Sequence, residues 1–162
     1  MENYSVLTTL YKNDNPVFLK QSIDSMLVQT KATNDYVIVE DGSITKDLER
    51  VLEEYRAKYN FFHIVKLEEN GGLGVALRAG LQECKNELVA RLDADDLSAP
   101  ERCELQLKEF EKNPELAIVG SDMYEFDEDP KKIKDIKRMP ATSDQIYQYG
   151  KRRNPFNHSS VM

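Results

Sequence analysis

The stretch ELVARLDADDLSAPERCELQ, residues 87–106, joins a strand pattern to a helix pattern through a dense acidic cluster. Its apolar start at 88–92 is typical of a short strand that is buried on both faces. Three aspartates follow within four positions: Asp93, Asp95 and Asp96. Ser98 and Glu101, with Pro100 between them, form a capping-box pattern that predicts the start of a helix. The stretch therefore predicts a strand, a charged loop and a helix in direct succession.

This alternation of strand and helix patterns runs along most of the chain. Apolar runs of strand length lie at 5–10, 36–40, 61–67, 88–92 and 116–120. Between these runs, apolar residues recur with helical spacing in four groups: Leu19, Ile23, Met26 and Leu27; Leu48, Val51, Leu52 and Tyr55; Leu73, Leu77 and Leu81; Leu105, Leu107 and Phe110. Strands that alternate with helices predict right-handed βαβ units and a mostly parallel sheet, which is an α/β fold.

The size and charge of the chain limit its class. The 162 residues suffice for a single domain, 1–162, and the final NPFNHSSVM is expected to be cut inside an element, as in a truncated chain. With 22 Lys plus Arg against 29 Asp plus Glu, the net charge of −7 argues against nucleic-acid binding. The charged stretch 125–140 predicts an exposed excursion or an edge hairpin.

Cysteine usage and the amino-terminal sequence indicate the compartment. Cys84 and Cys103 lack metal-ligand spacing, so both are expected to be reduced thiols. The chain shows neither the pattern of a secretory signal nor a run of about 18 apolar residues that would span a membrane. These features predict a cytoplasmic protein, and they leave open a peripheral position at the inner face of the plasma membrane for a longer parent protein. The sequence does not predict an oligomeric state.

Polar and glycine-rich segments follow each of the first four predicted strands. At the carboxyl end of the first strand lie Thr8, Thr9 and Tyr11, and at that of the second lie residues 40–43; residues 70–74 follow the third strand and residues 93–96 the fourth. Ligands of parallel α/β sheets bind outside the carboxyl ends of the strands. The sequence therefore predicts that these segments converge on one binding site.

The acidic cluster has two interpretations. In an extended segment, Asp93 and Asp95 would point the same way and repel each other unless a cation lies between them. Hard divalent ions prefer such oxygen ligands, and a diphosphate would supply the remaining oxygens. In the alternative, Asp95 and Asp96 lie at the start of a helix, where the helix dipole favours acidic side chains. The spacing alone leaves both interpretations open.

The segments after the second and third strands are also ambiguous. EDGS, around Asp41, is a favourable turn sequence, but its carboxylate could also accept hydrogen bonds from a base or a ribose. The loop NGGLG at 70–74 could hold phosphate with its backbone N–H groups, although it matches neither common phosphate-binding motif. Arg78, one turn into the following helix, would face either the phosphates or solvent.

Five stretches, taken in order, resemble the nucleotide-sugar half of the family 2 glycosyltransferases: SVLTTLY, VIVEDGS, NGGLGVALRAGL, VARLDADDLSAPERCELQ and NPFNHSSVM. These are inverting enzymes of bacterial polysaccharide assembly. The resemblance covers nearly the whole chain and implies the GT-A fold, a Rossmann-like α/β/α sandwich. It also implies that the domain holds a nucleotide diphosphate sugar, usually a UDP-sugar, through Mn²⁺ or Mg²⁺ at a D-x-D motif.

Carried over position by position, the resemblance implies five residues at the nucleotide. Thr9 and Tyr11 would border the uracil, and Asp41 would form a hydrogen bond with it. Arg78 lies in the segment that lines the nucleotide pocket in relatives. Asp93, the first aspartate of the acidic cluster, would contact the ribose or the metal.

The resemblance also implies the metal ligands and the course of the reaction. Asp95 would be the principal ligand of the metal, and His158 falls where the family has a histidine close to the metal and the diphosphate. The carboxylate base of the family lies after the position of HSSVM, so it is expected beyond Met162. The acceptor would be a saccharide or a lipid-linked saccharide, and we expect this chain to bind its donor without efficient transfer.

Two other functions remain possible from the sequence. A nucleotidyltransferase would also combine a Rossmann-like sheet with metal-binding acids, but the commonest ones carry a glycine-rich basic loop after the first strand. The corresponding loop here, TTLYKNDNP, contains no glycine. A non-catalytic module that binds a nucleotide sugar would fit a chain that lacks the base.

Overall fold

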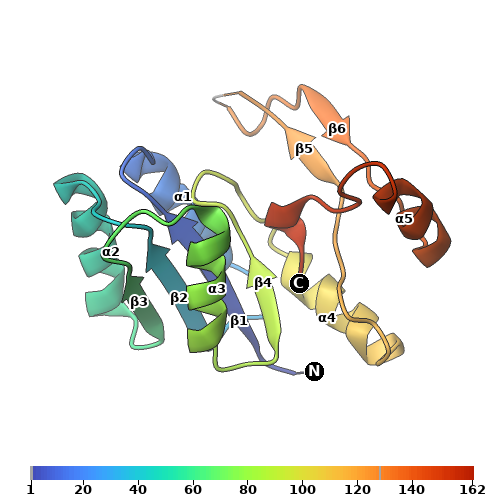
Figure 1. The fold of residues 1–162 in the computed structure, drawn as a ribbon, viewed down its shortest axis with the longest axis horizontal. Helices are drawn as coiled ribbons and strands as arrows, with labels where there is room; N and C mark the ends of the chain where they lie inside the picture. Colours follow the sequence, from blue (N-terminus) through green and yellow to red (C-terminus); the bar gives the residue numbers. More distant parts are fainter. Residues whose placement is uncertain (1, 128) are drawn as a thin grey trace.

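The centre of the fold is a parallel four-stranded sheet in the order β3-β2-β1-β4. The computed structural model describes residues 2–127 and 129–162. The strands are β1 (Tyr4–Leu10), β2 (Asp35–Glu40), β3 (Phe62–Lys66) and β4 (Leu88–Arg91), and all of their pairings are parallel. The predicted α/β fold with a parallel sheet is therefore confirmed, and four of the five predicted strands are present (Figure 1).

Helices cover both faces of this sheet. On one face, α1 (Pro16–Leu27), α2 (Lys46–Lys58) and α4 (Arg102–Lys112) contribute to a large apolar core. On the other face, α3 (Leu73–Glu83) packs on a smaller cluster that contains Leu7, Val37 and Val39. The predicted α/β/α sandwich is confirmed. Both cysteines are free thiols, as predicted, and burial raises the pKa of the Cys84 thiol to about 11.

The face of α3 that meets the sheet differs from the predicted one. Ala76 and Gly80 are buried, whereas Leu73 and Leu81 are 47% and 54% exposed. A Cβ atom added to Gly80 would overlap the side chain of Leu7 and lie 2.7 Å from Val39 Cγ2. The small residues let the helix backbone approach the sheet closely; Leu77 packs at the edge of this contact, and Leu73 and Leu81 lie on the outer side.

The predicted start of α4 is also wrong. The helix begins at Arg102 after Glu101, which makes no side-chain capping hydrogen bond. Ser98 instead lies in the preceding loop, where its hydroxyl accepts a hydrogen bond of 3.1 Å from Gln29 Nε2. Leu105, expected on the apolar face, is 57% exposed, and the buried face contains Arg102 and Gln106 besides Cys103 and Leu107. Arg102 and Gln106 are buried because they donate hydrogen bonds to the backbone carbonyls of Val161 and Ser160.

The fifth predicted strand, 116–120, is not a strand of the sheet. The backbone of Val161 lies beside β4 instead, and its carbonyl accepts a 2.9 Å hydrogen bond from the N–H of Arg91. Val119 lies on the other side of this segment from β4, where it exchanges two 2.9 Å backbone hydrogen bonds with Met162. The prediction failed because residues distant in sequence occupy the place beside β4.

The remaining elements form a smaller lobe beside the sheet (Figure 1). The predicted hairpin is confirmed as β5 (Met123–Glu125) and β6 (Asp135–Lys137), which pair antiparallel. Helix α5 (Ser143–Gly150) follows with a capping box between Thr142 and Gln145, and the short 3₁₀ helix η1 (His158–Ser160) leads back to β4. No helix within residues 2–127 and 129–162 is long and apolar enough to cross a membrane.

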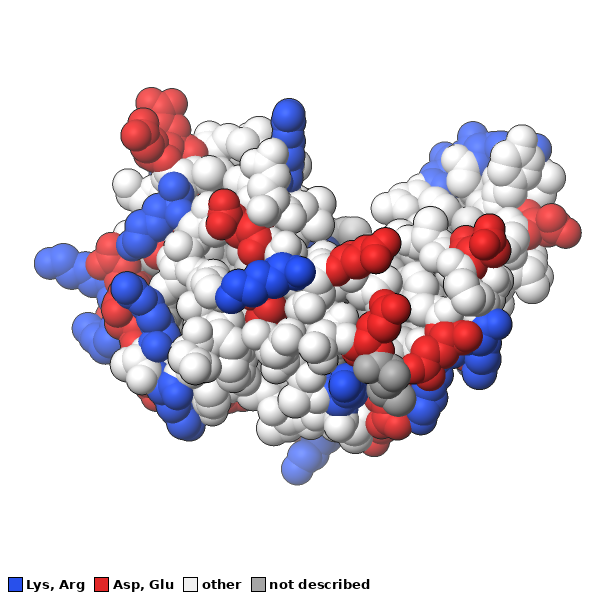
Figure 2. Space-filling view, turned by 90° about the horizontal axis from the view of Figure 1, so that it is seen from below, with Lys and Arg blue, Asp and Glu red and all other residues white. Residues whose placement is uncertain are grey.

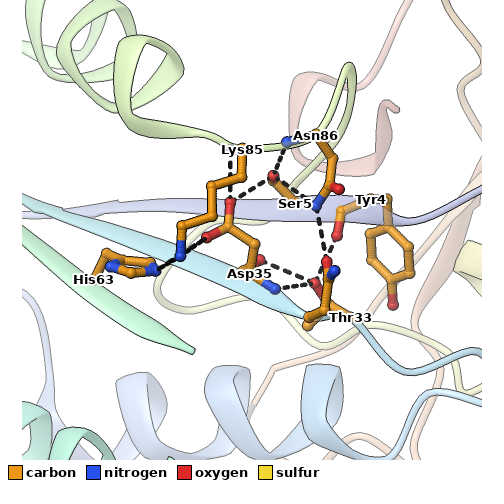
Figure 3. A network of polar contacts seen from close by, with 8 residues as sticks. Tyr4, Ser5, Thr33, Asp35, His63, Lys85 and Asn86 are labelled. Atoms are coloured by element: carbon orange, nitrogen blue, oxygen red, sulfur yellow. Dashed lines mark hydrogen bonds and ion pairs between the residues drawn. The ribbon is translucent and has the colours of Figure 1, made fainter. Parts of the chain in front are cut away.

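A buried carboxylate connects the amino ends of the strands (Figure 3). Asp35, at the start of β2, is fully buried. Its Oδ2 accepts hydrogen bonds of 2.6 Å from the Ser5 hydroxyl and 2.9 Å from the Lys85 backbone N–H. Its Oδ1 lies 3.2 Å from His63 Nε2 and 3.6 Å from Lys85 Nζ. Asp35 thereby links β1, β2, β3 and the loop before β4.

We expect Asp35→Ala to lower the free energy of unfolding by about 2–4 kcal/mol. The substitution leaves the Ser5 hydroxyl and the Lys85 amide without the oxygen that now accepts from both. Urea denaturation would measure the change. The control is Glu53→Ala on α2, where an exposed ion pair with Arg56 contributes about 0–1 kcal/mol. A loss at Asp35 no larger than at Glu53 would contradict this account.

Candidate functional site

A cavity of about 320 Å³ lies at the carboxyl edge of the sheet. It is lined by the last two residues of β1 and by residues that follow all four strands: Thr9, Leu10, Tyr11, Asp14, Asp41, Asn70, Gly72, Leu73, Asp93, Ala94 and Asp95. The predicted convergence of four segments is thus present. The cavity brings together five of the predicted site residues: Thr9, Tyr11, Asp41, Asp93 and Asp95.

The segment after β1 forms a tight turn at one side of the cavity. The backbone N–H of Tyr11 donates a 2.8 Å hydrogen bond to Asp14 Oδ2, and the N–H of Asp14 donates to the Tyr11 carbonyl at 3.1 Å. Asn15 then caps α1, which begins with Pro16. This turn leaves Tyr11 41% exposed at the cavity, where its ring offers a flat surface to a planar ligand.

The segments after β2 and β3 are joined through the Asp41 carboxylate. Its Oδ1 accepts a 2.7 Å hydrogen bond from the N–H of Gly71, and its Oδ2 accepts one of 3.0 Å from Gly72. Gly42 adopts a φ of 79°, and a Cβ there would lie 2.7 Å from the Asn70 nitrogen. The expectation that this loop holds phosphate through its amides is not met at Gly71 and Gly72, because both donate to Asp41.

Asp41→Asn is expected to lower the free energy of unfolding by about 1.5–3 kcal/mol, because one of the two hydrogen bonds to the charged carboxylate is lost. The asparagine amide nitrogen has no lone pair to accept from a glycine N–H. Hydrogen exchange at the amides of Gly71 and Gly72 would report the loss locally. Unchanged exchange at both glycines would contradict the assignment of Asp41 as the residue that holds this loop.

The acidic cluster lies in a turn rather than in an extended segment. Ala94 and Asp95 form the turn, and the N–H of Asp96 donates to the Asp93 carbonyl at 3.3 Å. Ser22 on α1 donates to the same carbonyl at 2.8 Å. The prediction that strand alternation aligns Asp93 and Asp95 is therefore wrong. The alternative based on a helix start is also wrong, because α4 begins only at Arg102.

Burial and neighbouring negative charges raise the pKa values of two carboxyl groups around this turn. Burial raises the pKa of Asp96 above its usual value; the hydrogen bond from Ser159 opposes the rise, and the charges of Asp93 and Asp95 add to it. Burial also raises the pKa of Asp14, with a further rise from Asp95 and Asp93. A bound divalent cation would lower the mutual repulsion of these carboxylates.

Two basic side chains flank Asp93. The guanidinium of Arg91 forms an ion pair with Oδ1 of Asp93, and His158 Nε2 lies 3.7 Å from its Oδ2. Arg91 is buried, and its Nε and Nη1 have no hydrogen-bond partner among the described residues. These contacts bring His158 to the acidic turn, although it does not line the cavity.

The three predicted metal ligands do not form a ready-made cage. Within the described part of the chain, no group of three or more His, Cys, Asp and Glu side chains is arranged to hold a metal ion. Asp95 is exposed at the cavity, whereas Asp93 is paired with Arg91. This arrangement suits ions such as Mg²⁺, which one or two carboxylates hold together with the phosphates of a ligand.

The structure changes the list of site residues in both directions. Arg78 is exposed on α3 and is not among the residues that line the cavity. Asp14, Arg91 and Ser159 were missed by the sequence analysis. Only Arg91 gave a signal, because a cation inside an otherwise apolar strand pattern needs a buried partner. Asp14 lies at the cavity in the turn after β1, and Ser159 reaches the site through a hydrogen bond to Asp96, which is distant in sequence.

The fold is an α/β domain of the GT-A type, and comparison with known proteins gives its family. The profile described as "Glycosyl transferase family 2" matches residues 5–162. The chain therefore belongs to glycosyl transferase family 2. The mannosyltransferase PcManGT from Pyrobaculum calidifontis, solved with GDP-Man and Mn²⁺, shares the fold with a TM-score of 0.64 at 18% identity, over 74% of this chain and 35% of that one.

Two curated relatives match almost the whole chain. It is 40% identical to the amylovoran biosynthesis glycosyltransferase AmsE of Erwinia amylovora, over 98% of this chain and 59% of the relative. It is 37% identical to the Escherichia coli UDP-Gal:alpha-D-GlcNAc-diphosphoundecaprenol beta-1,3-galactosyltransferase, over 98% of this chain and 57% of the relative. The chain thus spans less than two thirds of the length of either relative.

Proposed function

We propose that this chain forms the donor-binding part of an inverting glycosyltransferase that takes a sugar from a UDP-sugar in the assembly of cell-surface polysaccharide. One observation carries the proposal: Thr9 at the end of β1 lines one cavity together with Tyr11, Asp41, Asp93 and Asp95 from three separate loops. The E. coli relative, whose name specifies UDP-Gal, supports uridine as the nucleoside. The name of AmsE, which specifies amylovoran biosynthesis, supports the role in polysaccharide assembly.

The residues have distinct roles in this proposal. Thr9 and Tyr11 border the uracil, and Asp41 accepts a hydrogen bond from it while holding the glycine-rich loop. Asp93 contacts the ribose, with its charge balanced by Arg91. Asp95, exposed at the cavity, is the principal ligand of Mn²⁺ or Mg²⁺, and His158 lies next to Asp93 on the metal side. Arg78 receives no role.

The chemistry follows from where these side chains place the diphosphate. The acceptor hydroxyl attacks C1 of the sugar from the face opposite UDP, so the configuration inverts, and the C1–O bond to the diphosphate breaks as the new bond forms. A bound divalent ion supplies charge stabilisation to the departing diphosphate. Asp95 and the turn around it hold that end of the donor. The acceptor hydroxyl gives its proton to a general base, to which we assign no residue. We propose a saccharide acceptor attached to a lipid diphosphate, as in the name of the E. coli relative.

A nucleotide panel separates this proposal from nucleotidyl transfer. Calorimetric titration of UDP, GDP, UTP and CTP in the presence of Mn²⁺ is expected to show the tightest binding for UDP. Preferential binding of CTP or UTP would favour a nucleotidyltransferase. A donor-binding module without transfer activity would bind UDP equally well, so transfer from a UDP-sugar to an acceptor must be measured separately. The proposed place of this reaction is the cytoplasm, at the inner face of the plasma membrane.

A further inference from the structure

The charges of the chain are segregated between its two parts. Residues 130–162 contain eight basic residues, Lys131, Lys132, Lys134, Lys137, Arg138, Lys151, Arg152 and Arg153, and two acidic residues, Asp135 and Asp144, for a net charge of +6. Of the 22 basic and 29 acidic residues, 14 and 27 therefore remain in residues 1–129, for a net charge of −13. We call residues 131–153 the basic lobe.

The cations of the basic lobe are accessible and converge. Residues 131–138 and 151–153 are all exposed. Arg138 from the first segment and all three cations of the second line a hollow of about 850 Å³ beside α5. Within the described residues, no carboxylate lies within ion-pair distance of Lys151, Arg152 or Arg153, and Arg138 has only Asp122, at 3.7 Å. The hollow therefore concentrates uncompensated positive charge.

Apolar and aromatic side chains accompany these cations. Tyr147, Ile133 and Ile136 in the lobe are exposed, as is Tyr124 on β5. Lys151 Nζ lies 4.5 Å from the centroid of the Tyr147 ring. Tyrosines with apolar bodies and polar tips, interleaved with lysine and arginine, are typical of surfaces that lie at the head-group level of a membrane.

We propose that the basic lobe binds the surface of a bilayer that contains anionic phospholipids. Polybasic clusters of four to eight cations bind such surfaces through the negative potential of the lipid head groups. The acidic remainder of the chain would be repelled from the same surface, which favours one orientation. The exposed Ile133 and Ile136 beside the cations favour a bilayer over a nucleic acid, whose backbone offers negative charge but no apolar layer.

The position of the lobe gives this binding a consequence for the site. The β5–β6 hairpin rises on the same side of the molecule as the carboxyl ends of β1 and β4 (Figure 1). On the face seen from below, a notch divides the upper edge of the molecule, and the part to its right carries basic side chains at its upper end and acidic side chains at its outer edge (Figure 2). Docking through the lobe would hold the cavity edge near the bilayer, where a lipid-attached acceptor would be found.

Sedimentation with phosphatidylcholine vesicles, prepared with and without phosphatidylglycerol, tests the proposal. The chain should bind only the anionic vesicles, and added salt should release it. The triple variant Lys151→Gln/Arg152→Gln/Arg153→Gln should bind them on the order of 100-fold more weakly, because each cation near the surface contributes about fivefold. Lys46→Gln/Arg50→Gln/Lys58→Gln on α2 removes the same charge from another exposed surface and should bind as the unaltered chain does.

Several results would overturn the proposal. These are equal binding to neutral vesicles, equal losses in the two triple variants, or retention by RNA or inorganic phosphate without retention by anionic vesicles. If the first variant unfolds, Lys131→Gln/Lys132→Gln/Lys137→Gln in the β5–β6 hairpin provides the same test, and we expect the same loss of binding. UDP titration should be unchanged in either lobe variant, so failure of membrane binding is distinguishable from failure of the donor site.

Discussion

Asp95→Asn is expected to remove the gain in UDP affinity that Mn²⁺ provides, a loss of about 100-fold or more. Loss of an outer partner of a metal ligand already weakens metal binding by about 10- to 100-fold, and a direct ligand contributes at least the upper end of that range. Asp95 is the exposed carboxylate of the acidic turn, whereas Asp93 is paired with Arg91. Calorimetry with UDP, with and without Mn²⁺, would measure the effect.

The control for this substitution is Asp47→Asn on α2, which removes an equal charge from an exposed ion pair with Arg50. It should leave both titrations unchanged. UDP binding without metal should differ little between Asp95→Asn and the unaltered chain, since the lost interaction runs through the ion. If Asp95→Asn retains the full gain from Mn²⁺, the assignment of Asp95 as the principal ligand is wrong.

Gly80→Ala is expected to lower the free energy of unfolding by about 1–3 kcal/mol. Helix propensity alone would favour alanine by about 1 kcal/mol. The added Cβ, however, would overlap Leu7 and approach Val39 Cγ2 to 2.7 Å, in a place where β1, β2 and α3 are all tightly packed. The steric cost therefore exceeds the gain in propensity. Urea denaturation would give the net sign.

Gly74→Ala in the same helix provides the matched control. A Cβ added there meets no atom within 4 Å, so only the propensity effect remains. We expect this variant to be unchanged or to gain up to about 1 kcal/mol. Stabilisation by Gly80→Ala of the same size as by Gly74→Ala would contradict the close approach of α3 to the sheet.

Much of the fold follows from local patterns. The four strands of the sheet are runs of apolar residues between helical segments, and their order in the chain requires crossovers that bring the carboxyl ends to one edge. The run 116–120 has the same local pattern but forms no strand of the sheet. Its place beside β4 is taken by Val161, a choice that depends on contacts more than forty residues apart and leaves no local trace.

Cavity residues could be predicted from the sequence where they lie at the end of a strand or soon after it, as with Thr9, Asp41 and Asp95. It was not predictable where packing sets the direction of a side chain. The sequence predicted that Leu73, Leu77 and Leu81 of α3 face the sheet. Because Ala76 and Gly80 face it instead, the helix is rotated and Arg78 is exposed.

Calorimetric titration of UDP into the chain, with and without Mn²⁺, would show whether the cavity at the carboxyl edge of the sheet binds a nucleotide. We expect UDP to bind at one site per chain and Mn²⁺ to strengthen the binding. The reason is that Asp95 lines the cavity beside the position proposed for the diphosphate. A cooperative thermal transition in the same sample would establish that the chain is folded. Failure of this folded chain to bind UDP, with or without the metal, would contradict the account.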